Sequence, residues 1–408
     1  MMNIIWVSFF ILSFIAACMQ SFILENFDIW NQIVNELFAA ATNAFQLSLN
    51  LTGMLCLWLG LLKIAEKSGL TAILAKALRP LFKIIMPEIP DDSSALGSIV
   101  MNMAANILGL DNAATPMGLK AMEQLQEINN NKSKASNAQI MFIVINASAI
   151  TVLPISILMY RHLQGSANPA AVFIPILLAT SCSTIAGFFA VAFVQKINIF
   201  NKTLCYYVFA FIAIIAGIAG YFYTLDENTR LTFSEMAGNA LILGFITLFL
   251  LCGIYKKINV YETFIEGAKD GFTIAVQIIP YLVAMLTAIA AIRYSGVLNW
   301  IVTGFTKIFT LVGLNTDFIP ALPTALMKPL SGNGARAMMI ETMQTYGADS
   351  FPAFVSSVVQ GSTETTLYVI ALYFGAIKIS QTRHALPCAL FADFVGIVAA
   401  IGLSYIFY

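Results

Sequence analysis

Charged residues are scarce in this 408-residue chain. Asp, Glu, Lys and Arg make up 10% of it and hydrophobic residues 59%, whereas charged residues form about 25% of soluble domains. A water-soluble globule of this length needs charge to cover its surface. The composition therefore excludes a soluble enzyme, a nucleic-acid-binding protein and a disordered chain. The class that remains is a polytopic membrane protein, with lipid as the solvent for most of its surface.

Other features that carry chemistry are also lacking. Only two His are present, His162 and His384, which excludes a His-rich metal site. The six Cys form no Cys-x-x-Cys pair and fall in or beside apolar runs, as free thiols packed like small apolar residues do. No phosphate loop, nucleotide fingerprint, nucleophile elbow or zinc motif occurs. We therefore expect no enzymatic activity, no ATP-driven pumping by this chain alone, no cofactor and no nucleic-acid partner.

Apolar segments long enough to cross a bilayer recur along the chain. A crossing helix needs about 20 apolar residues, and the first such run carries no Lys or Arg in residues 1–17, so we expect an uncleaved span there rather than a signal peptide. The regions 70–128 and 296–346 are apolar but interrupted by Pro, Gly, Asn and charge. The sequence predicts about nine full spans, at residues 3–24, 47–66, 138–160, 170–195, 204–223, 236–254, 274–293, 352–376 and 385–407.

The distribution of cations indicates the orientation. If the N-terminus lies inside, 15 of the 21 Lys and Arg residues fall in inside segments and 6 in outside segments. The first outer loop carries Glu25, Asp28 and Glu36 and no cation. Inside loops of membrane proteins are enriched in Lys and Arg. The sequence therefore predicts an N-terminus on the inside and a C-terminus on the outside of a bacterial cytoplasmic (inner) membrane.

An internal repeat divides the chain. Ser68-Gly69 matches Ser295-Gly296, each closing an apolar span, and an Asn-x-Ala motif and a polar run recur in the same order later in both halves. We predict a first repeat over 1–200, a linking span and loop over 201–235, and a second repeat over 236–408. Five spans precede the second copy, so it is inverted. Inverted repeats with broken segments at matching positions are typical of secondary transporters.

Each repeat also carries an amphipathic stretch, at 26–46 and 259–273. Glu36, Glu262 and Glu266 lie there among apolar residues at helical spacing. A helix lying flat at the membrane interface explains this pattern without any further chemistry.

The broken regions and the spans that follow them are the candidate solute site. Unwound backbone at membrane depth is tolerated only inside protein or beside water, where its free N–H and C=O groups can contact a solute. The alternative is tight helix packing through small residues with polar clasps. The candidate binding residues share a polar side chain in these segments: Asn106, Asn112, Thr115, Asn146, Ser148, Thr151, Ser331, Asn333, Arg336, Gln360, Ser362, Thr363, Glu364 and Thr365.

Glu364 is the most informative of them, because it is ionisable in the middle of the span 352–376. A charge there is costly in lipid and marks a functional candidate. It is a protonatable coupling group, a ligand of Na+, the partner of a substrate cation, or half of a structural ion pair with Arg336 or Lys328. Asp393 in the last span is a second candidate, facing a neighbouring helix or water. We expect no other metal, and a coupling ion of H+ or Na+.

Longer motifs resemble a known family. Residues 1–200 are similar to spore maturation protein A, in the stretches 57–69, 104–116 and 136–146. Residues 236–408 are similar to spore maturation protein B, in the stretches 279–285, 330–335, 347–350 and 361–366. The chain thus resembles a natural fusion of the two. One departure is Asp111, where this resemblance implies a small residue.

Both belong to the nucleoside-recognition (Gate) group, which is similar to part of the concentrative nucleoside transporters. The resemblance therefore implies inverted repeats and re-entrant hairpins with polar tips, and it implies transport more than it implies nucleosides.

Two functions follow from the sequence. The first is a secondary transporter of a small polar organic solute, nucleoside-like or amino-acid- or peptide-like, coupled to H+ or Na+, with its site between the two repeats. The second is a non-transporting membrane factor in envelope or spore maturation. No loop outside the apolar elements exceeds roughly 15 residues, which leaves no soluble docking domain and favours transport. The expected partners are a small-molecule solute, the lipid bilayer and a second copy of the chain in a homo-oligomer.

Overall fold

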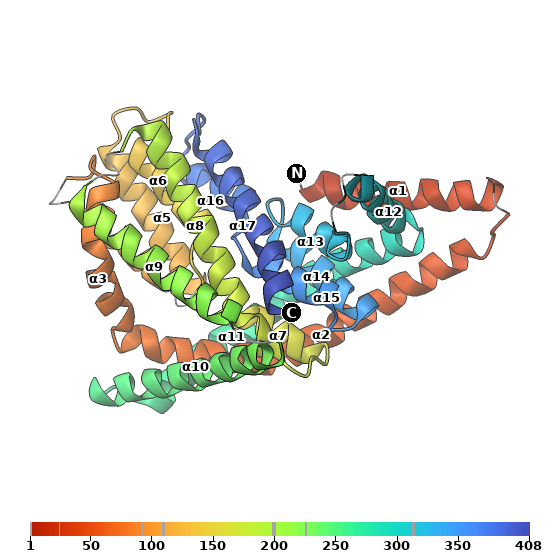
Figure 1. Ribbon diagram of the computed structural model, residues 1–408, viewed down its shortest axis with the longest axis horizontal. Coiled ribbons are helices and arrows are strands. Elements are labelled where there is room, and N and C mark those ends of the chain that lie inside the picture. The colour runs from red at the N-terminus through yellow and green to blue at the C-terminus, as the bar shows by residue number, and fades with distance from the viewer. Residues whose placement is uncertain are drawn as a thin grey trace.

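The computed structural model describes residues 2–23, 25–90, 93–107, 111–197, 201–224, 227–311, 313 and 315–408. Within these ranges the chain is built from helices (Figure 1), and its only extended pairing is an isolated bridge between Lys134 and Gln381. The all-α class predicted from the sequence is confirmed.

The helices run in the same order in the two halves of the chain. The first half contains α1 (Met2–Ile23), α2 (Ile29–Lys67), α3 (Leu70–Ile85), α4 (Ala95–Ile107), α5 (Asp111–Ile128), α6 (Asn137–Ala147), α7 (Ile155–Leu163), the 3-10 turn η1 (Pro169–Val172) and α8 (Phe173–Gln195). After α9 (Lys202–Thr224), the second half contains α10 (Glu227–Tyr255), α11 (Val260–Tyr294), α12 (Val297–Leu311), η2 (Ile319–Ala321), α13 (Leu322–Met327), α14 (Gly332–Tyr346), α15 (Phe351–Gly361), α16 (Thr366–Ala376) and α17 (Ala385–Phe407). A duplicated unit would produce this order of helices. The duplication itself and its boundaries stay a prediction.

The Ser-Gly pairs end the two longest helices in the same way. Gly69 and Gly296 adopt left-handed backbone conformations, with φ of 79° and 78°, which glycine reaches without steric cost. Each glycine turns the chain from a long helix into a short one, α2 into α3 and α11 into α12. The two Ser-Gly pairs, which occupy corresponding positions in the two halves of the sequence, therefore form the same kind of turn.

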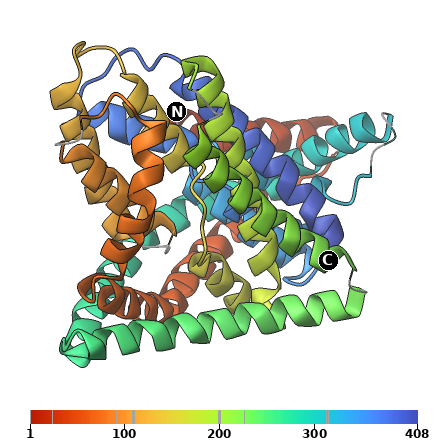
Figure 2. The ribbon, with the colours of Figure 1, turned by 60° about the vertical axis from the view of Figure 1, so that its left-hand side comes forward.

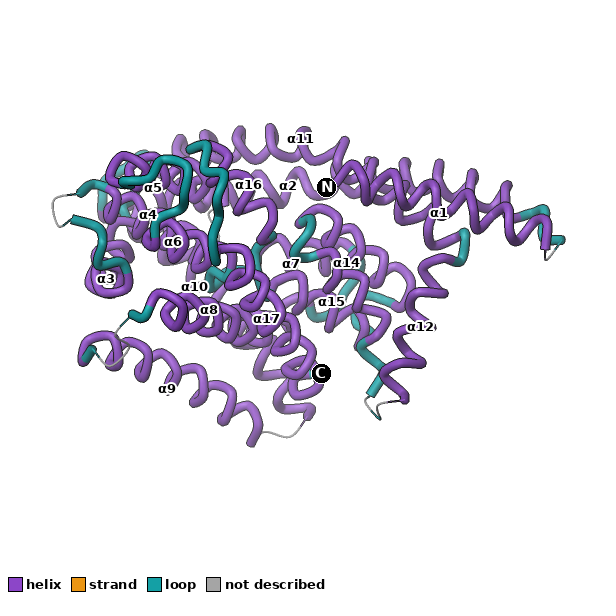
Figure 3. Tube along the Cα trace, turned by 90° about the horizontal axis from the view of Figure 1, so that it is seen from above, coloured by secondary structure: helices purple, strands orange, loops and turns teal. Residues whose placement is uncertain are grey.

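The amphipathic stretches 26–46 and 259–273 are continuous with the spans that follow them, and their position at the membrane interface stays a prediction. They form the first parts of α2 and α11, because no helix-breaking residue separates them from the spans that follow. The helices α2 and α11 pack along each other (Figure 3), with Gly60 against Phe264 and Gly267 against the Leu59 carbonyl. These contacts join the two halves along their longest helices.

Two of the predicted spans are discontinuous. Residues 138–160 divide into α6 and α7, and residues 352–376 divide into α15 and α16. Pro154 explains the first break, since it has no N–H and its ring clashes with the preceding turn. In the second, Gly361 ends the helix, and the short hydroxyl side chains after it compete for backbone hydrogen bonds. Glu364 therefore lies in a break and not in the middle of a helix.

Within the described part of the chain, five helical segments are long and apolar enough to cross a membrane: Trp6–Ile23, Ile29–Lys67, Pro169–Gln195, Val260–Tyr294 and Ala385–Phe407. The protein is thus a polytopic membrane protein. Shorter apolar helices account for further segments, α9 and α10 among them. The count of nine spans stays a prediction.

The halves are interlocked. α1 of the first half packs on α11 of the second, where the Trp6 indole donates to the Ala284 carbonyl at 2.9 Å. Reciprocally, α10 of the second half packs on α2 of the first and runs along one side of the molecule (Figure 2). The buried Arg161 at the end of α7 pairs with Asp349, before α15, at 2.9 Å. These contacts hold the elements around the site in one body.

Candidate functional site

Each broken region forms a helical hairpin. In the first half, α4 packs against α5, and the buried Asn102 of α4 donates to the Ala114 carbonyl of α5 at 2.7 Å. In the second half, α13 packs against α14, and the chain turns through Pro329 to Ser331. The Ser331 hydroxyl caps α14 by accepting from the Gly334 N–H at 3.0 Å. The polar residues at these places thus first serve to close the hairpins.

The two helix breaks meet each other. The Glu364 N–H, in the break between α15 and α16, donates to the carbonyl of Ala147 at the end of α6, at 2.8 Å. This bond pairs a freed donor of one break with a freed acceptor of the other. Unwound backbone inside a membrane protein needs such partners.

Each break also bonds to the hairpin of its own half. The Val152 N–H donates to the Ile107 carbonyl at the end of α4, at 3.0 Å, and the Leu367 N–H donates to the Pro329 carbonyl after α13, at 3.1 Å. The two halves therefore place a hairpin end against a helix break by the same kind of bond. The two hairpins and the two helix breaks are held together in this way.

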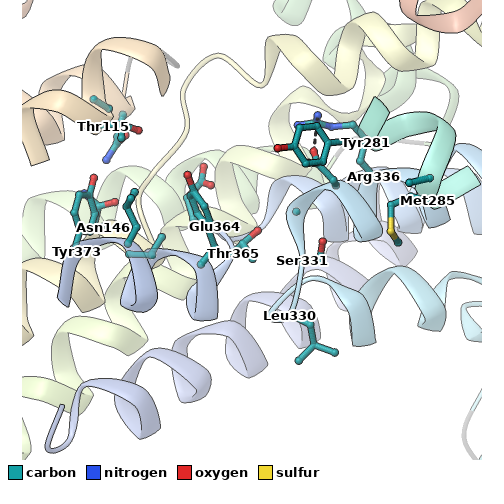
Figure 4. Close-up of a pocket in the computed structure, with 18 of the residues that line it drawn as sticks. Thr115, Asn146, Tyr281, Met285, Leu330, Ser331, Arg336, Glu364, Thr365 and Tyr373 are labelled. Atoms are coloured by element: carbon teal, nitrogen blue, oxygen red, sulfur yellow. Dashed lines mark hydrogen bonds between the residues drawn. The ribbon is translucent and has the colours of Figure 1, made fainter. Parts of the chain in front are cut away.

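A cavity of about 820 Å³ opens where these segments meet. Figure 4 shows Thr115, Asn146 and Tyr373 at one end, Ser331, Arg336 and Met285 at the other, and Glu364 and Thr365 between them. Its polar lining residues are Asn106, Thr115, Asn146, Ser331, Asn333, Arg336, Glu364 and Thr365, and its aromatic lining residues are Trp6, Tyr281, Tyr368 and Tyr373. This volume lies within the range of about 300–1,000 Å³ that is usual for small-molecule sites.

A second cavity, of about 120 Å³, lies behind the first and reaches toward α7. Its lining includes Thr151, Gln360 and Thr363. Both cavities are lined by Gly332, Arg336, Glu364 and Thr365. A wall made by the start of α14 and the second helix break thus stands between the two spaces.

The charged groups of this wall have separate partners. The Arg336 guanidinium donates to Asn333 Oδ1 at 3.3 Å and lies over the Tyr160 ring at 5.4 Å. Among the described residues, the ion pairs do not include one between Arg336 and Glu364. The Glu364 carboxylate is partly exposed in the cavity. A cationic and an anionic group therefore face the same space without neutralising each other directly.

The structure brings most of the predicted site residues to these two cavities. Two do not line either: the Ser148 hydroxyl donates to the Val144 carbonyl and the Ser362 hydroxyl to the Val359 carbonyl, each at 2.8 Å in a fully buried position. They bond back to their own helices, as serine does near a helix end. The side chain of Asn112 lies outside the described residues, so its role in binding stays a prediction.

Several residues that line the larger cavity or hold its lining in place escape sequence reasoning. Asn102 accepts from the Asn146 amide at 2.6 Å and fixes that side chain at the cavity edge. Its position four residues before Asn106, on one helical face, is a signal that spacing could have revealed. Trp6, Tyr281 and Tyr373 carry no such signal, because aromatic residues in spans are usually lipid-facing or packed.

Comparisons with known proteins agree with this architecture. The nucleoside-recognition (Gate) family model matches residues 48–162 and 275–380, which include both hairpins and both breaks. Spore maturation protein B of Bacillus subtilis (strain 168) is 45% identical over 152 residues, 37% of this chain and 84% of that protein. Spore maturation protein A of the same organism is 41% identical over 188 residues, 46% of this chain and 92% of that protein.

A more distant relative is inner membrane protein YjiG of Escherichia coli (strain K12), 32% identical over 92 residues, 22% of this chain and 60% of that protein. No solved structure matches the chain. Since the family model spans more than half of the chain and the chain covers most of both spore maturation proteins, it belongs to the nucleoside-recognition (Gate) family.

Proposed function

We propose that the protein is a secondary transporter that carries a small polar organic solute across the bacterial cytoplasmic membrane, coupled to a cation gradient. The observation that carries this proposal is the pair of cavities that share one wall at the meeting point of two hairpins and two helix breaks. Transporters place their substrate at discontinuous helices between repeats, and move one part against the other around that site. A thin wall that rearranges would open the site to one side at a time.

The lining favours a solute with both a ring or other flat apolar part and several hydrogen-bonding groups. Aromatic residues supply flat apolar surface, and the Asn, Ser and Thr side chains supply donors and acceptors. The N-terminus of α14 and Arg336 favour an anionic or carbonyl group, since helix N-termini carry partial positive charge. Glu364 favours an ammonium or hydroxyl donor. Nucleosides and amino-acid- or peptide-like solutes both meet this description, and the family name places nucleosides first.

A ligand screen on the purified full chain tests the proposal. Nucleosides, amino acids, dipeptides and carboxylates are compared by the shift in melting temperature, and each hit is then offered to proteoliposomes under a cation gradient. We expect one class to raise the melting temperature and to accumulate inside the vesicles. Protein-free vesicles and vesicles with a dissipated gradient are the controls. Binding without gradient-dependent accumulation contradicts transport.

A second candidate function is a non-transporting factor in envelope maturation. The observation in its favour is that two relatives bear the name spore maturation protein. This function needs the two halves as a packed platform and needs no solute. Failure of every solute class to accumulate, in vesicles where the protein is folded, would favour it.

A further inference from the structure

Asp393 lies on α17 and is the carboxylate most removed from solvent near the site. Asp393 is 1% exposed. Within the described part of the chain, neither of its carboxylate oxygens has a hydrogen-bond partner. Burying an ionised carboxylate without a partner costs several kcal/mol. A carboxylate in such a place is stable when it carries a proton or contacts a cation.

Other unpartnered oxygens surround it. Thr363 lies in the break between α15 and α16 and Thr366 in the first turn of α16, and both hydroxyls are close neighbours of the Asp393 carboxylate. Both are buried and, among the described residues, do not reach hydrogen-bond geometry with the carboxylate or another group, and Gln360 Oε1 at the end of α15 likewise has no partner. Every unpartnered atom of this group is an oxygen. Oxygen ligands are those that hard cations prefer.

The packing brings this segment onto α17. A side chain added at Gly396, one turn after Asp393, would meet Thr363 Cγ2 at 2.8 Å, and the Ser183 hydroxyl of α8 donates to the Ala392 carbonyl at 3.0 Å. The oxygens therefore lie between the helix break, α17 and α8, and Thr363 and Gln360 also border the smaller cavity. Glu364 differs, since it faces the open cavity.

We propose that Asp393, Thr363 and Thr366 form a binding site for Na+. A single proton on Asp393 would satisfy one acceptor, whereas a bound cation contacts several oxygens at once. The C-terminal end of α15 points into the break and contributes partial negative charge, and half-helix C-terminal ends coordinate Na+ in other transporters. Two charges act on the site from nearby, Lys328 and Glu364, and they have opposite signs.

This inference rests on the proposed function for its purpose and deepens it by placing the coupling ion. Thr363 and Thr366 are the proposed ion ligands in this segment, while Glu364 and Thr365, between them in the chain, line both solute cavities. Binding of Na+ would order the break and with it the wall between the cavities. Thr363 also lines the smaller cavity, so the ion and the solute would act on one structural element.

Na+ binding is tested without any solute, on the purified full chain in detergent. The melting temperature is measured in increasing NaCl, with choline chloride holding ionic strength constant and KCl as the comparison ion. We expect a saturable rise with Na+ that K+ does not reproduce. A wild-type protein without this rise overturns the proposal, because the two hydroxyls would then suffice for the carboxylate.

Variants locate the site. Asp393→Asn should abolish the Na+ shift, and Thr363→Val, which keeps the shape and removes the hydroxyl, should weaken the affinity about tenfold, or about 1.4 kcal/mol. Ser404→Ala removes a buried hydroxyl elsewhere on α17 and should keep the wild-type shift. If Asp393→Asn does not fold, Thr363→Val decides. An unchanged Na+ affinity in Thr363→Val, or a shift lost in Ser404→Ala, overturns the assignment.

The outcome is separable from that of the proposed function. Na+ binding at Asp393 with no solute transported would leave this site standing and contradict transport. Solute accumulation that is indifferent to Na+ would leave transport standing and overturn this site.

Discussion

At the residue scale, Glu364 places a carboxylate on the wall between the two cavities. Glu364→Gln keeps the size of the side chain and removes the charge. The residue is partly exposed and lies outside any helix, so we expect the variant to fold. Hydrogen bonds to charged groups are worth about 1.5–3 kcal/mol. Solute affinity should therefore fall by at least about tenfold, measured by concentration-dependent uptake and by the solute-induced melting shift.

The matched control for this prediction is Glu123→Gln, an exposed carboxylate on α5 that lines neither cavity. It should transport as the wild type does. If Glu364→Gln takes up the solute with unchanged rate and affinity, the binding role assigned to Glu364 is wrong.

Asn102 provides a second prediction at this scale, on stability. Asn102→Ala removes the donor to the Ala114 carbonyl and the acceptor for the Asn146 amide, both in buried positions. Polar contacts between helices in membranes are worth about 0.6–2 kcal/mol, so we expect unfolding to become easier by a value in that range, with a lower melting temperature. Asn106→Ala, one turn away with a longer contact of 3.5 Å, is the control. An equal loss in both variants contradicts the clasp.

Sequence reasoning reached much of the site at this scale, because uncharged polar side chains in apolar segments are easy to see. It could not tell which of them face a cavity. Ser148 and Ser362 occupy equivalent places in the pattern, yet both bond back to their own helices. Asp393 gives the weaker signal of the two carboxylates, because its surroundings come from α8 and from the helix break, far away in the sequence.

At the scale of elements, the seam between α2 and α11 is the longest contact in the molecule. Gly267 and Gly271 of α11 lie one turn apart and face Leu59 and Leu55 of α2. A Cβ atom at Gly267 would come within 2.3 Å of the Leu59 carbonyl oxygen, which is backbone and cannot yield. Small residues four apart are a common means of close helix contact in membranes.

Gly267→Val should therefore force α2 and α11 apart, with a marked fall in melting temperature and in the yield of monodisperse protein. Gly53→Ala on α2 is the control, since a Cβ there meets no atom within 4 Å. Alanine favours helix over glycine by about 1 kcal/mol, so this change should leave stability equal or higher. A Gly267→Val protein as stable as the wild type would show that the seam is not held by close approach.

Hydropathy located the apolar elements well and the breaks poorly. A window of about 20 residues averages over an interruption of only a few residues, so 352–376 read as one span although Ser362 to Thr365 are not helical. The opposite difficulty affects 26–46 and 259–273, where charged residues hide the continuity of each stretch with the span that follows. There the charges are accommodated by pairing between helices, as Glu266 with Lys67, which one segment considered alone does not reveal.

At the scale of the whole molecule, loop contacts bear on the arrangement of spans. Each contact joins segments with an even number of predicted spans between them: Lys67 with Glu266, Lys134 with Gln381, and Arg161 with Asp349. Segments in contact must lie on the same side of a bilayer. The spacing of spans read from the sequence is therefore consistent with the packing, although neither fact alone says which side is the inside.

Cysteine labelling tests the orientation, in a variant without the six native cysteines. Lys132 and Ala167 are exposed and lie on either side of the segment α6–break–α7. Because cations favour the inside, we expect a membrane-impermeant maleimide to label Ala167→Cys in intact cells and Lys132→Cys only after permeabilisation. The reverse pattern would overturn the N-inside orientation and keep the arrangement of spans. Labelling of both in intact cells would mean that the broken segment does not cross, and the inverted relation of the halves would fall with it, because that relation needs an odd number of crossings before the second half.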